Sequence, residues 1–264
     1  MVDSPSAEFY NKTKENETKH KRSHFKRVSP VTQTKPTKTE EVIMKIKKII
    51  DLTQPIFHNC PGWPTYAATE VHHETVVGID GYTSEILKCN SHTSTHLDAP
   101  FHFFAGMETI DQIPIEAFIG PAVLVDLVGV EACHAIGPKD LEPYAGKIKK
   151  GSIVLLNTGW SGKRGFSKEY YADWPYLTGE GAKWLLDKGV KGVGIDGMSM
   201  GGWYEGTGRP CHEVLLPNGV WLLEEILFPE EIRQYKEFEL TAVPLRLQGF
   251  GGSPCRAYAT IYED

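Results

Sequence analysis

The sequence lacks the features that define several protein classes. No apolar run approaches the ~18 residues of a transmembrane helix, and the N-terminus has no apolar segment of the kind found in secretory signals. Basic residues are outnumbered: 28 Lys and Arg stand against 34 Asp and Glu in 264 residues, for a net charge of −6. We therefore expect neither membrane insertion nor nucleic-acid binding.

Cysteine is scarce and shows no pattern. The five cysteines are an odd number at scattered positions, and no Cys-x-x-Cys pair occurs. This spacing argues against a disulfide framework and favours a reducing compartment, so we expect a cytoplasmic protein. Cys211, beside His212, is the one thiol with a candidate redox or metal role, although a free cysteine is more often simply buried.

Periodic apolar residues are missing from the first part of the chain. Residues 1–43 are rich in Lys, Thr, Ser, Asn and Glu and show neither a twofold nor a 3.6-residue period. Such a segment buries too little apolar surface to offset the entropy lost on ordering. We expect a disordered polar extension over 1–43 and one folded domain over 44–264, a length that suits a single α/β domain.

Strand signals outnumber helix signals from residue 44 onward. Apolar runs separated by Gly and Pro are typical of strands in a half-buried or fully buried sheet. Thr178 and Gly189 are suitable caps for the best helix. The pattern predicts a single α/β domain with a mixed, barrel-like β-sheet flanked by helices. The expected strands are 46–52, 70–77, 84–89, 122–128, 152–157, 192–196, 220–223, 238–247 and 255–262, and the expected helices are 138–147 and 178–188.

The most informative segment is 92–102, which reads His-Thr-Ser-Thr-His-Leu-Asp-Ala-Pro-Phe-His. It brings together four groups, His92, His96, Asp98 and His102. Neutral imidazole and carboxylate are ligands that suit Zn(II), Mn(II) or Fe(II). A single histidine is more often an ordinary core or surface residue, but a cluster is costly to bury without a cation or a full hydrogen-bond network. We interpret the segment as part of a metal site.

The composition of this segment favours an extended backbone. Thr93 and Thr95 are β-branched, and Pro100 disfavours helix at the residue before it. In a strand the four groups share one face, but side chains two residues apart are separated by about 6.5–7 Å. One ion cannot contact all four groups along a straight strand. Either the backbone bends near residues 99–100, or two ions lie side by side, or one end group is catalytic.

Further carboxylates and one further histidine stand in the second half. His212 lies in an expected loop and Glu224 at the end of an apolar strand. Taken alone, both are more readily interpreted as surface charges, as is the neighbouring Glu225. Asp196 follows a buried strand, where a carboxylate is either catalytic or caps the next turn.

Two other patterns have ordinary interpretations as well. The glycine-rich turn 249–254 lacks the strand–loop–helix context and the Lys of a phosphate loop, so we do not expect a nucleotide site. Its backbone either faces a substrate or forms a tight connection. Trp63, Trp160, Trp203 and Phe101 are candidates for an aromatic pocket, although each is more often a core residue.

The pattern His92-x-x-Thr95-His96-x-Asp98-x-Pro100-x-His102 resembles the signature of the metal-dependent cyclase family. This family includes bacterial kynurenine formamidases and isatin hydrolases. The similarity spans roughly residues 44–264. It includes the first strand at 50–53, a substrate loop at 63–64, a late strand at 194–196 and a C-terminal turn at 251–254.

The resemblance implies a set of site residues. In the kynurenine formamidases, the positions of His92, His96 and Asp98 bind metal, and a later His and Glu twelve residues apart complete a two-zinc site. Here His212 and Glu224 are twelve residues apart, so the resemblance makes them ligands rather than surface charges. The position of His102 acts as general acid and base.

The resemblance also implies a cofactor and an assembly. The isatin hydrolases use a single manganese, so the expected cofactor is Zn(II), as one or two ions, or Mn(II). The family fold is an α/β domain around a mixed, barrel-like sheet, assembled as homodimers or homotetramers. Three departures bear on the substrate: Ser94 replaces a usual Gly, Thr65-Tyr66 replaces a usual Gly-Asp, and the run 197–202 differs.

The expected function is hydrolysis of an amide by metal-activated water. A divalent metal lowers the pKa of bound water from about 15.7 toward roughly 7, and His102 is suited to protonate the leaving nitrogen. The foremost substrate is an aryl-formamide such as N-formylkynurenine, which would yield kynurenine and formate. The first alternative is ring opening of isatin or another cyclic amide or lactone.

Two alternatives belong to other classes. A non-haem iron oxygenase would use His96, Asp98 and His212 as its triad. That assignment leaves His92 and Glu224 over, and no Arg-x-Ser oxoacid-binding pattern follows His212. The other alternative is a non-catalytic metal-binding protein with the same fold.

Overall fold

The structure is a computed structural model, and it describes residues 45–263. The extension predicted over 1–43 lies outside the described residues. All the residue ranges in which the sequence predicts a strand or a helix lie inside residues 45–263. Among the helices of residues 45–263, none combines the length and the apolar character needed to cross a bilayer.

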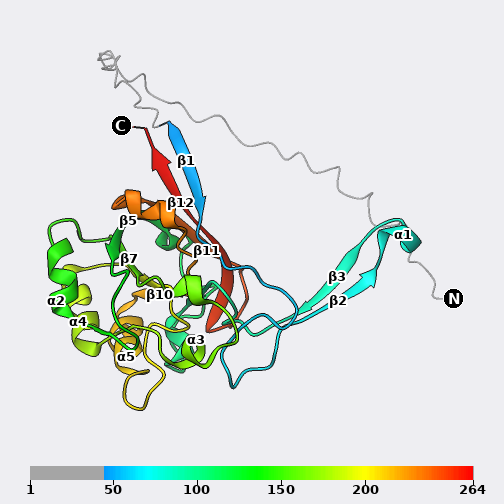
Figure 1. The fold of residues 1–264 in the computed structure, drawn as a ribbon, viewed down its shortest axis with the longest axis horizontal. Helices are drawn as coiled ribbons and strands as arrows, with labels where there is room; N and C mark the ends of the chain where they lie inside the picture. The colour runs from blue at the N-terminus through cyan, green and yellow to red at the C-terminus, as the bar shows by residue number, and fades with distance from the viewer. Residues whose placement is uncertain (1–44, 264) are drawn as a thin grey trace, which may run out of the picture. The chain divides into compact units, whose positions relative to one another are not determined.

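Seven strands close into a mixed barrel, as the sequence pattern predicts (Figure 1). Their order is β12-β11-β5-β7-β9-β10-β4, and β4 also pairs with β12, which closes the ring. β5, β7, β9 and β10 run parallel to one another, and the remaining pairs are antiparallel. The strands are β4 (His96–Asp98), β5 (Ile119–Asp126), β7 (Ile153–Asn157), β9 (Gly192–Ile195), β10 (Trp221–Glu224), β11 (Glu237–Pro244) and β12 (Gly252–Tyr262), with β1 (Ile46–Asp51) added outside β12.

The buried strands are apolar on both faces because both faces are covered. In β7, Ile153 and Leu155 belong to the cluster that fills the barrel, together with Leu240 of β11. Val154 and Leu156 belong to a second cluster beneath the helices. Alternation of side chains along a strand separates the two clusters, and this explains the continuous apolar runs in the sequence.

The helices are short, and all except α1, which joins two strands of a projecting hairpin, pack on the outside of the barrel. α4 begins after Thr178, whose Oγ1 accepts a 3.0 Å hydrogen bond from the Gly181 N–H, and ends at Gly189 with φ 74°. Both caps agree with the sequence prediction. The helix expected over 138–147 is only α2 followed by a 3₁₀ turn, because Pro143 lacks an N–H donor. The helices are α1 (Val77–Asp80), α2 (Pro138–Leu141), α3 (Lys168–Ala172), α4 (Gly179–Lys188) and α5 (Pro210–Leu215).

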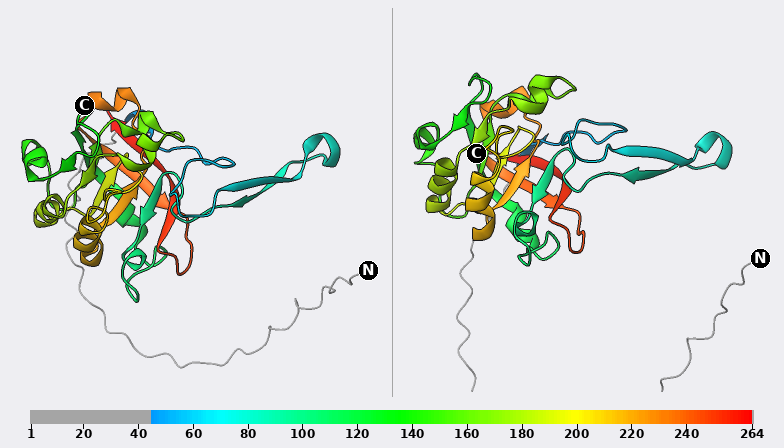
Figure 2. Two further views of the ribbon diagram at one scale, coloured as in Figure 1. Left: turned by 60° about the horizontal axis from the view of Figure 1, so that its bottom comes forward. Right: turned by 90° about the horizontal axis from the view of Figure 1, so that it is seen from below.

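A two-stranded hairpin projects from the barrel (Figure 2). It consists of β2 (Glu70–Thr75) and β3 (Ser84–Lys88), joined through α1, and the two strands pair only with each other. Ile79 at its tip is 88% exposed. We call this element the hairpin arm. A smaller pair, β6 (Ala135–Ile136) and β8 (Tyr176–Leu177), lies near the helices.

Candidate metal centre

The histidine-rich segment is bent rather than extended throughout. Only His96–Asp98 form a strand, and Pro100–His102 form a 3₁₀ turn. The extended backbone expected for this segment is limited to these three residues, and the bend near residue 100 was one of the three alternatives left open by the sequence. A second bend occurs at Ser94, where φ is +56°, a left-handed conformation that favours glycine.

Strand alternation places the ligand candidates outside the barrel. Leu97 faces the barrel core, so His96 and Asp98 face the opposite way. On the neighbouring strand β10, Leu223 faces the core and Glu224 faces outward. Because β4 and β10 are paired, these three outward side chains meet at one place on the barrel surface.

A close approach between the start of β12 and the His92 side chain brings His92 to the same place. A Cβ atom on Gly252 would lie 2.5 Å from the Cε1 atom of His92. Only glycine allows this contact, so Gly252, the first residue of β12, permits the packing of the metal centre. His92 Nδ1 lies 2.7 Å from Asp98 Oδ1.

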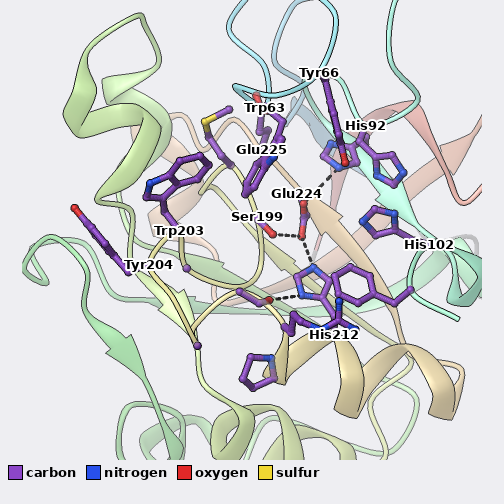
Figure 3. A pocket seen from close by; sticks show the side chains of 18 residues that line it. Trp63, Tyr66, His92, His102, Ser199, Trp203, Tyr204, His212, Glu224 and Glu225 are labelled. Atoms are coloured by element: carbon purple, nitrogen blue, oxygen red, sulfur yellow. Dashed lines mark hydrogen bonds and ion pairs between the residues drawn. The ribbon is translucent and has the colours of Figure 1, made fainter.

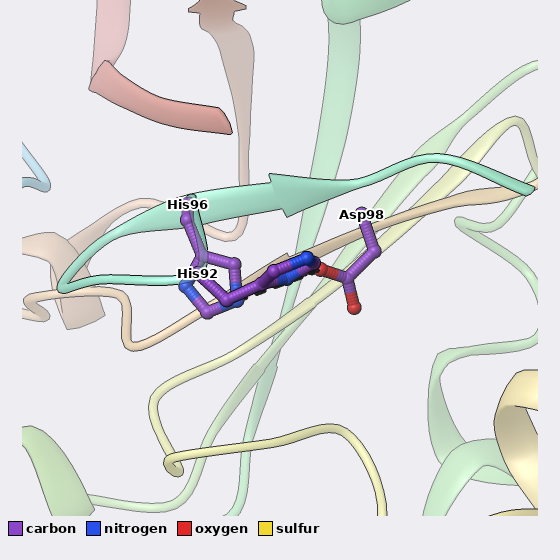
Figure 4. A group of neighbouring side chains, drawn as sticks. All are labelled: His92, His96 and Asp98. Atoms are coloured by element: carbon purple, nitrogen blue, oxygen red, sulfur yellow. Dashed lines mark hydrogen bonds and ion pairs between the residues drawn. The ribbon is translucent and has the colours of Figure 1, made fainter. Parts of the chain in front are cut away.

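The first cluster consists of His92, His96 and Asp98. Figure 4 shows these side chains directed toward one another beside β4. His96 Nε2 lies 3.5 Å from Asp98 Oδ1. One donor atom from each residue lies within 4.8 Å of the others, so the three can hold a metal ion.

The second cluster consists of Asp98, His212 and Glu224, again within 4.8 Å of one another. His212 Nε2 lies 3.3 Å from Glu224 Oε1 and 3.9 Å from Asp98 Oδ2. His212 lies in α5, so its expected placement in a loop was wrong. Asp98 belongs to both clusters, and the structure thus brings together all five ligands predicted from the sequence.

Backbone carbonyls orient the two most buried imidazoles. His96 Nδ1 donates to the Ser94 carbonyl at 2.7 Å, and His212 Nδ1 donates to the Gly208 carbonyl at 2.8 Å. Each bond leaves Nε2 facing the carboxylates. This arrangement is the usual way in which proteins fix a metal-binding imidazole.

The centre concentrates charge where water is excluded. Asp98 Oδ2 is buried and has no hydrogen-bond partner within residues 45–263. Burial lowers the pKa of His96, but the Glu224 hydrogen bond and the charges of Asp98 and Glu224 outweigh it and raise that pKa to about 9. The two buried carboxylates favour a positive charge on the neighbouring imidazole. Together these carboxylates and imidazoles form a donor set suited to a divalent cation.

His102 borders the centre without taking part in either cluster. Its ring centroid lies 4.0 Å from that of His92 and 6.4 Å from that of His212. Burial lowers the pKa of His102 to about 4, which keeps the imidazole neutral at physiological pH. A neutral ring at this position can accept or relay a proton.

A cavity of about 740 Å³ opens onto the metal centre. Figure 3 shows Trp63, Tyr66, Trp203 and His102 around it. The rings of Trp63 and Trp203 lie 5.2 Å apart and form an aromatic wall. Of the four aromatic residues singled out in the sequence, Trp63 and Trp203 line this cavity.

The other two aromatic candidates lie elsewhere. Trp160 packs in a small core cluster with Tyr170 and Trp174, and Phe101 is not among the cavity-lining residues. Asp196 accepts hydrogen bonds from the Thr158 N–H and hydroxyl and from the Ser161 N–H. Asp196 therefore caps a turn, the second of its two predicted roles.

Arg164 is a functional candidate that the sequence did not indicate. Its Nη2 donates to the Ser94 hydroxyl at 2.7 Å, and its Nε lies 3.6 Å from Glu225 Oε2. Ser94 carries the carbonyl that orients His96, and Glu225 follows the candidate ligand Glu224. Arg164 thus links two chain segments that supply candidate ligands, although its own segment has no recognisable motif.

Glu225 is buried rather than solvated, contrary to the sequence interpretation. It is 2% exposed, and burial raises its pKa to about 7. The Tyr170 hydroxyl donates to its Oε2 at 3.4 Å. The candidate ligand Glu224 has its own hydrogen bonds: its Oε1 accepts from the Met200 N–H at 2.6 Å and from the Ser199 hydroxyl at 3.2 Å.

These features define a class of α/β barrel proteins with a His/carboxylate metal centre beside an aromatic cavity. A family model named Cyclase matches residues 50–201. The kynurenine formamidase of Bacillus cereus is 30% identical over 220 residues, which cover 81% of this chain and 98% of that protein. The chain belongs to the cyclase family.

Solved structures agree with this assignment. A structure described as a potential metal-dependent hydrolase with cyclase activity is 28% identical, with a TM-score of 0.69 over 82% of this chain and 99% of that chain. Isatin hydrolase A from Labrenzia aggregata has a TM-score of 0.75 at 23% identity and covers 82% of this chain and 94% of that chain. The latter likeness concerns the fold.

Proposed function

We propose that this protein is a metal-dependent hydrolase of amide bonds, and that its substrate is an aryl-formamide such as N-formylkynurenine. The observation that carries the proposal is the pair of ligand clusters sharing Asp98 at the base of an aromatic cavity. The relationship to kynurenine formamidases over 81% of the chain supports the choice of substrate.

The proposed ligands are His92, His96, Asp98, His212 and Glu224. Two imidazoles face Asp98 in the first cluster, and one imidazole and two carboxylates form the second. This donor set suits Zn(II), as one or two ions, or Mn(II). When bound, such a metal supplies an activated water at neutral pH and polarises the scissile carbonyl.

His102 is the proposed general acid and base. Its neutral imidazole lines the cavity beside the clusters, where it can take a proton from the attacking water and return it to the leaving nitrogen. Departure of the aryl-amine requires this proton, because an amide anion is a poor leaving group. Trp63 and Trp203 would hold the aryl ring.

A cyclic amide such as isatin is the second candidate substrate. It needs the same attack on a carbonyl, and a flat bicyclic ring also suits the aromatic wall. The fold shared with isatin hydrolase A is compatible with this activity. The oxygenase alternative has no support, because His92 and Glu224 join the three residues of its supposed triad in the same centre.

The test is hydrolysis by the purified full chain. Protein stripped with a chelator should be inactive, and Zn(II) or Mn(II) should restore hydrolysis of N-formylkynurenine, followed by kynurenine absorbance. Isatin opening is measured in parallel. Activity that survives complete removal of metal, or absence of hydrolysis of both substrates by the reloaded protein, would contradict the proposal.

We further propose that the chain assembles as a homodimer or homotetramer in the cytoplasm. Apolar side chains exposed on the hairpin arm support the assembly, since Val77 is 64% and Tyr82 is 62% exposed. All five cysteines are free thiols, which supports a reducing compartment. The molecular mass in solution, measured by light scattering, tests the assembly.

A further inference from the structure

One arginine lines the cavity outside the metal centre. Of the lining residues, which all lie in the described part of the chain, only Arg209 is a Lys or Arg. The other charged groups of the lining are Glu224 and Glu225, which are engaged in the metal centre and with Arg164. A lone arginine in the wall of an aromatic cavity has no part in the hydrolytic chemistry described above.

The guanidinium of Arg209 makes two contacts. Its Nε donates to Glu213 Oε1 at 2.8 Å, one helical turn along α5. Its central carbon lies 5.1 Å from the ring centroid of Phe103. Within residues 45–263, neither Nη atom has a hydrogen-bond partner. The fork formed by the two Nη atoms is therefore free to bind an anion.

Phe103 also connects this arginine to the metal centre. The rings of Phe103 and His212 are stacked, with centroids 4.4 Å apart and planes 10° apart. Phe103 thus contacts both the guanidinium and a metal ligand. A substrate whose formyl group lies at the metal centre can extend past Phe103 toward the arginine.

We infer that Arg209 binds a carboxylate on the part of the substrate remote from the scissile amide. The inference rests on the proposed amide hydrolysis and specifies the substrate class: an aryl-formamide that carries a carboxylate on its side chain. The ion pair with Glu213 does not prevent this, because Glu213 accepts from Nε and leaves both Nη atoms available. Bidentate binding of carboxylate is the geometry that arginine favours.

The test uses two substrates that differ only in the carboxylate: N-formylkynurenine and its decarboxylated analogue, N-formylkynuramine. With the metal-loaded full chain, Arg209→Met should raise KM for the first about tenfold, in keeping with loss of a charge-assisted hydrogen bond. KM for the second should change less than about twofold, as should kcat for both. Arg209→Lys should lie between wild type and Arg209→Met, because it keeps the charge and loses the fork.

A matched control is Arg256→Met. Arg256 also pairs with a carboxylate at the surface, that of Asp51, but it lies outside the cavity. Its variant should leave KM for both substrates unchanged. If Arg209→Met changes KM for the two substrates equally, or for neither, the inference is wrong.

A binding measurement separates this inference from the proposed function. Calorimetry compares kynurenine with kynuramine, which lacks the carboxylate, on the wild type and on Arg209→Met. The wild type should bind kynurenine about tenfold more tightly, and the variant should lose that preference. If the wild type hydrolyses neither formamide, the proposed function fails, while this preference still decides the role of Arg209. Equal binding of both ligands by the wild type overturns the inference.

Discussion

The barrel and the hairpin arm are built from similar strands, yet they provide opposite environments. In the barrel, Leu155 of β7 is fully buried, and strands on both sides satisfy its backbone. In the hairpin arm, Ile86 and Leu87 of β3 are about half exposed, and each strand has one neighbour. The barrel can therefore hold metal ligands in fixed positions, whereas an isolated two-stranded hairpin is only marginally stable in water.

This difference separates two kinds of function. The proposed ligands come from, or pack against, β4, β10 and α5, where burial supplies rigidity and a low dielectric. The hairpin arm offers exposed apolar surface and no ligand cluster within the described residues. We expect substitutions in the barrel to change metal binding and turnover, and substitutions in the hairpin arm to change assembly alone.

The largest effect is expected for Asp98→Asn, because Asp98 belongs to both ligand clusters. Metal affinity should fall by more than about a hundredfold, beyond the usual effect of residues that only orient a ligand. Elemental analysis and turnover measure the loss. Asp187→Asn, on the exposed surface of α4, is the control and should retain full metal content. A metal-replete, active Asp98→Asn would refute the shared-ligand arrangement.

The next effect concerns His102, which lies in the cavity but outside both clusters. His102→Ala should lower kcat by roughly 10²–10⁴-fold, the range for loss of a general acid or base. Its metal content should stay close to that of the wild type. Loss of the metal in this variant would show that His102 is a ligand instead.

A smaller effect on metal affinity is expected for the residues that position His96 without binding the metal themselves. Arg164→Met and Ser94→Ala should each weaken metal affinity about tenfold, because both loosen the carbonyl that orients His96. The double variant should be little weaker than Arg164→Met alone, since both changes break the same hydrogen bond between Arg164 and Ser94. Chelator competition measures the affinities. Additive losses would show that the two side chains act independently.

The pH dependence of stability should differ between metal-free and metal-loaded protein. In the metal-free centre the pKa of His96 is about 9, against 6.5 for an unperturbed histidine. The stabilising contribution of its proton is complete below about pH 6.5 and is lost as the pH rises through 9. A bound metal replaces that proton, so loaded protein should gain stability over this range. Urea unfolding at pH 6.5 and pH 9 tests this, and parallel trends would contradict it.

The smallest effect on turnover is expected in the hairpin arm. Ile79→Ser at its exposed tip should leave kcat and metal content within about twofold of wild type, since surface changes away from packed groups are usually within 0.5 kcal/mol. The same variant should lower the molecular mass measured by light scattering. Unchanged mass would remove the hairpin arm from the proposed assembly contact.

The sequence predicted the parts of this molecule that depend on local chemistry. Apolar periodicity located the barrel strands and α4, and the spacing of His92, His96 and Asp98 indicated a metal site before any resemblance was considered. His212 and Glu224 were indicated only by family resemblance, because nothing local distinguishes them from surface charges. The strand alternation that brings Glu224 beside His96 depends on pairing between distant segments.

The features that the sequence did not predict depend on tertiary contacts. The left-handed turn at Ser94 is stabilised by Arg164, which lies seventy residues later and has no motif. The same arginine also lies 3.6 Å from the buried carboxylate of Glu225 and offsets its charge. Likewise, α5 begins at Pro210 after an irregular loop, where the sequence shows no apolar period long enough to indicate a helix.

The closure of the barrel by β4 has a consequence for biosynthesis. This short strand pairs on one side with β10 and on the other with the start of β12. Both partners are synthesised more than a hundred residues after it, so β4 stays unpaired while that part of the chain is made. The nascent chain thus exposes the proposed metal-binding histidines well before it can enclose them. A premature stop before residue 252 would remove β12 and leave one edge of β4 unpaired, although all five proposed ligands would be present.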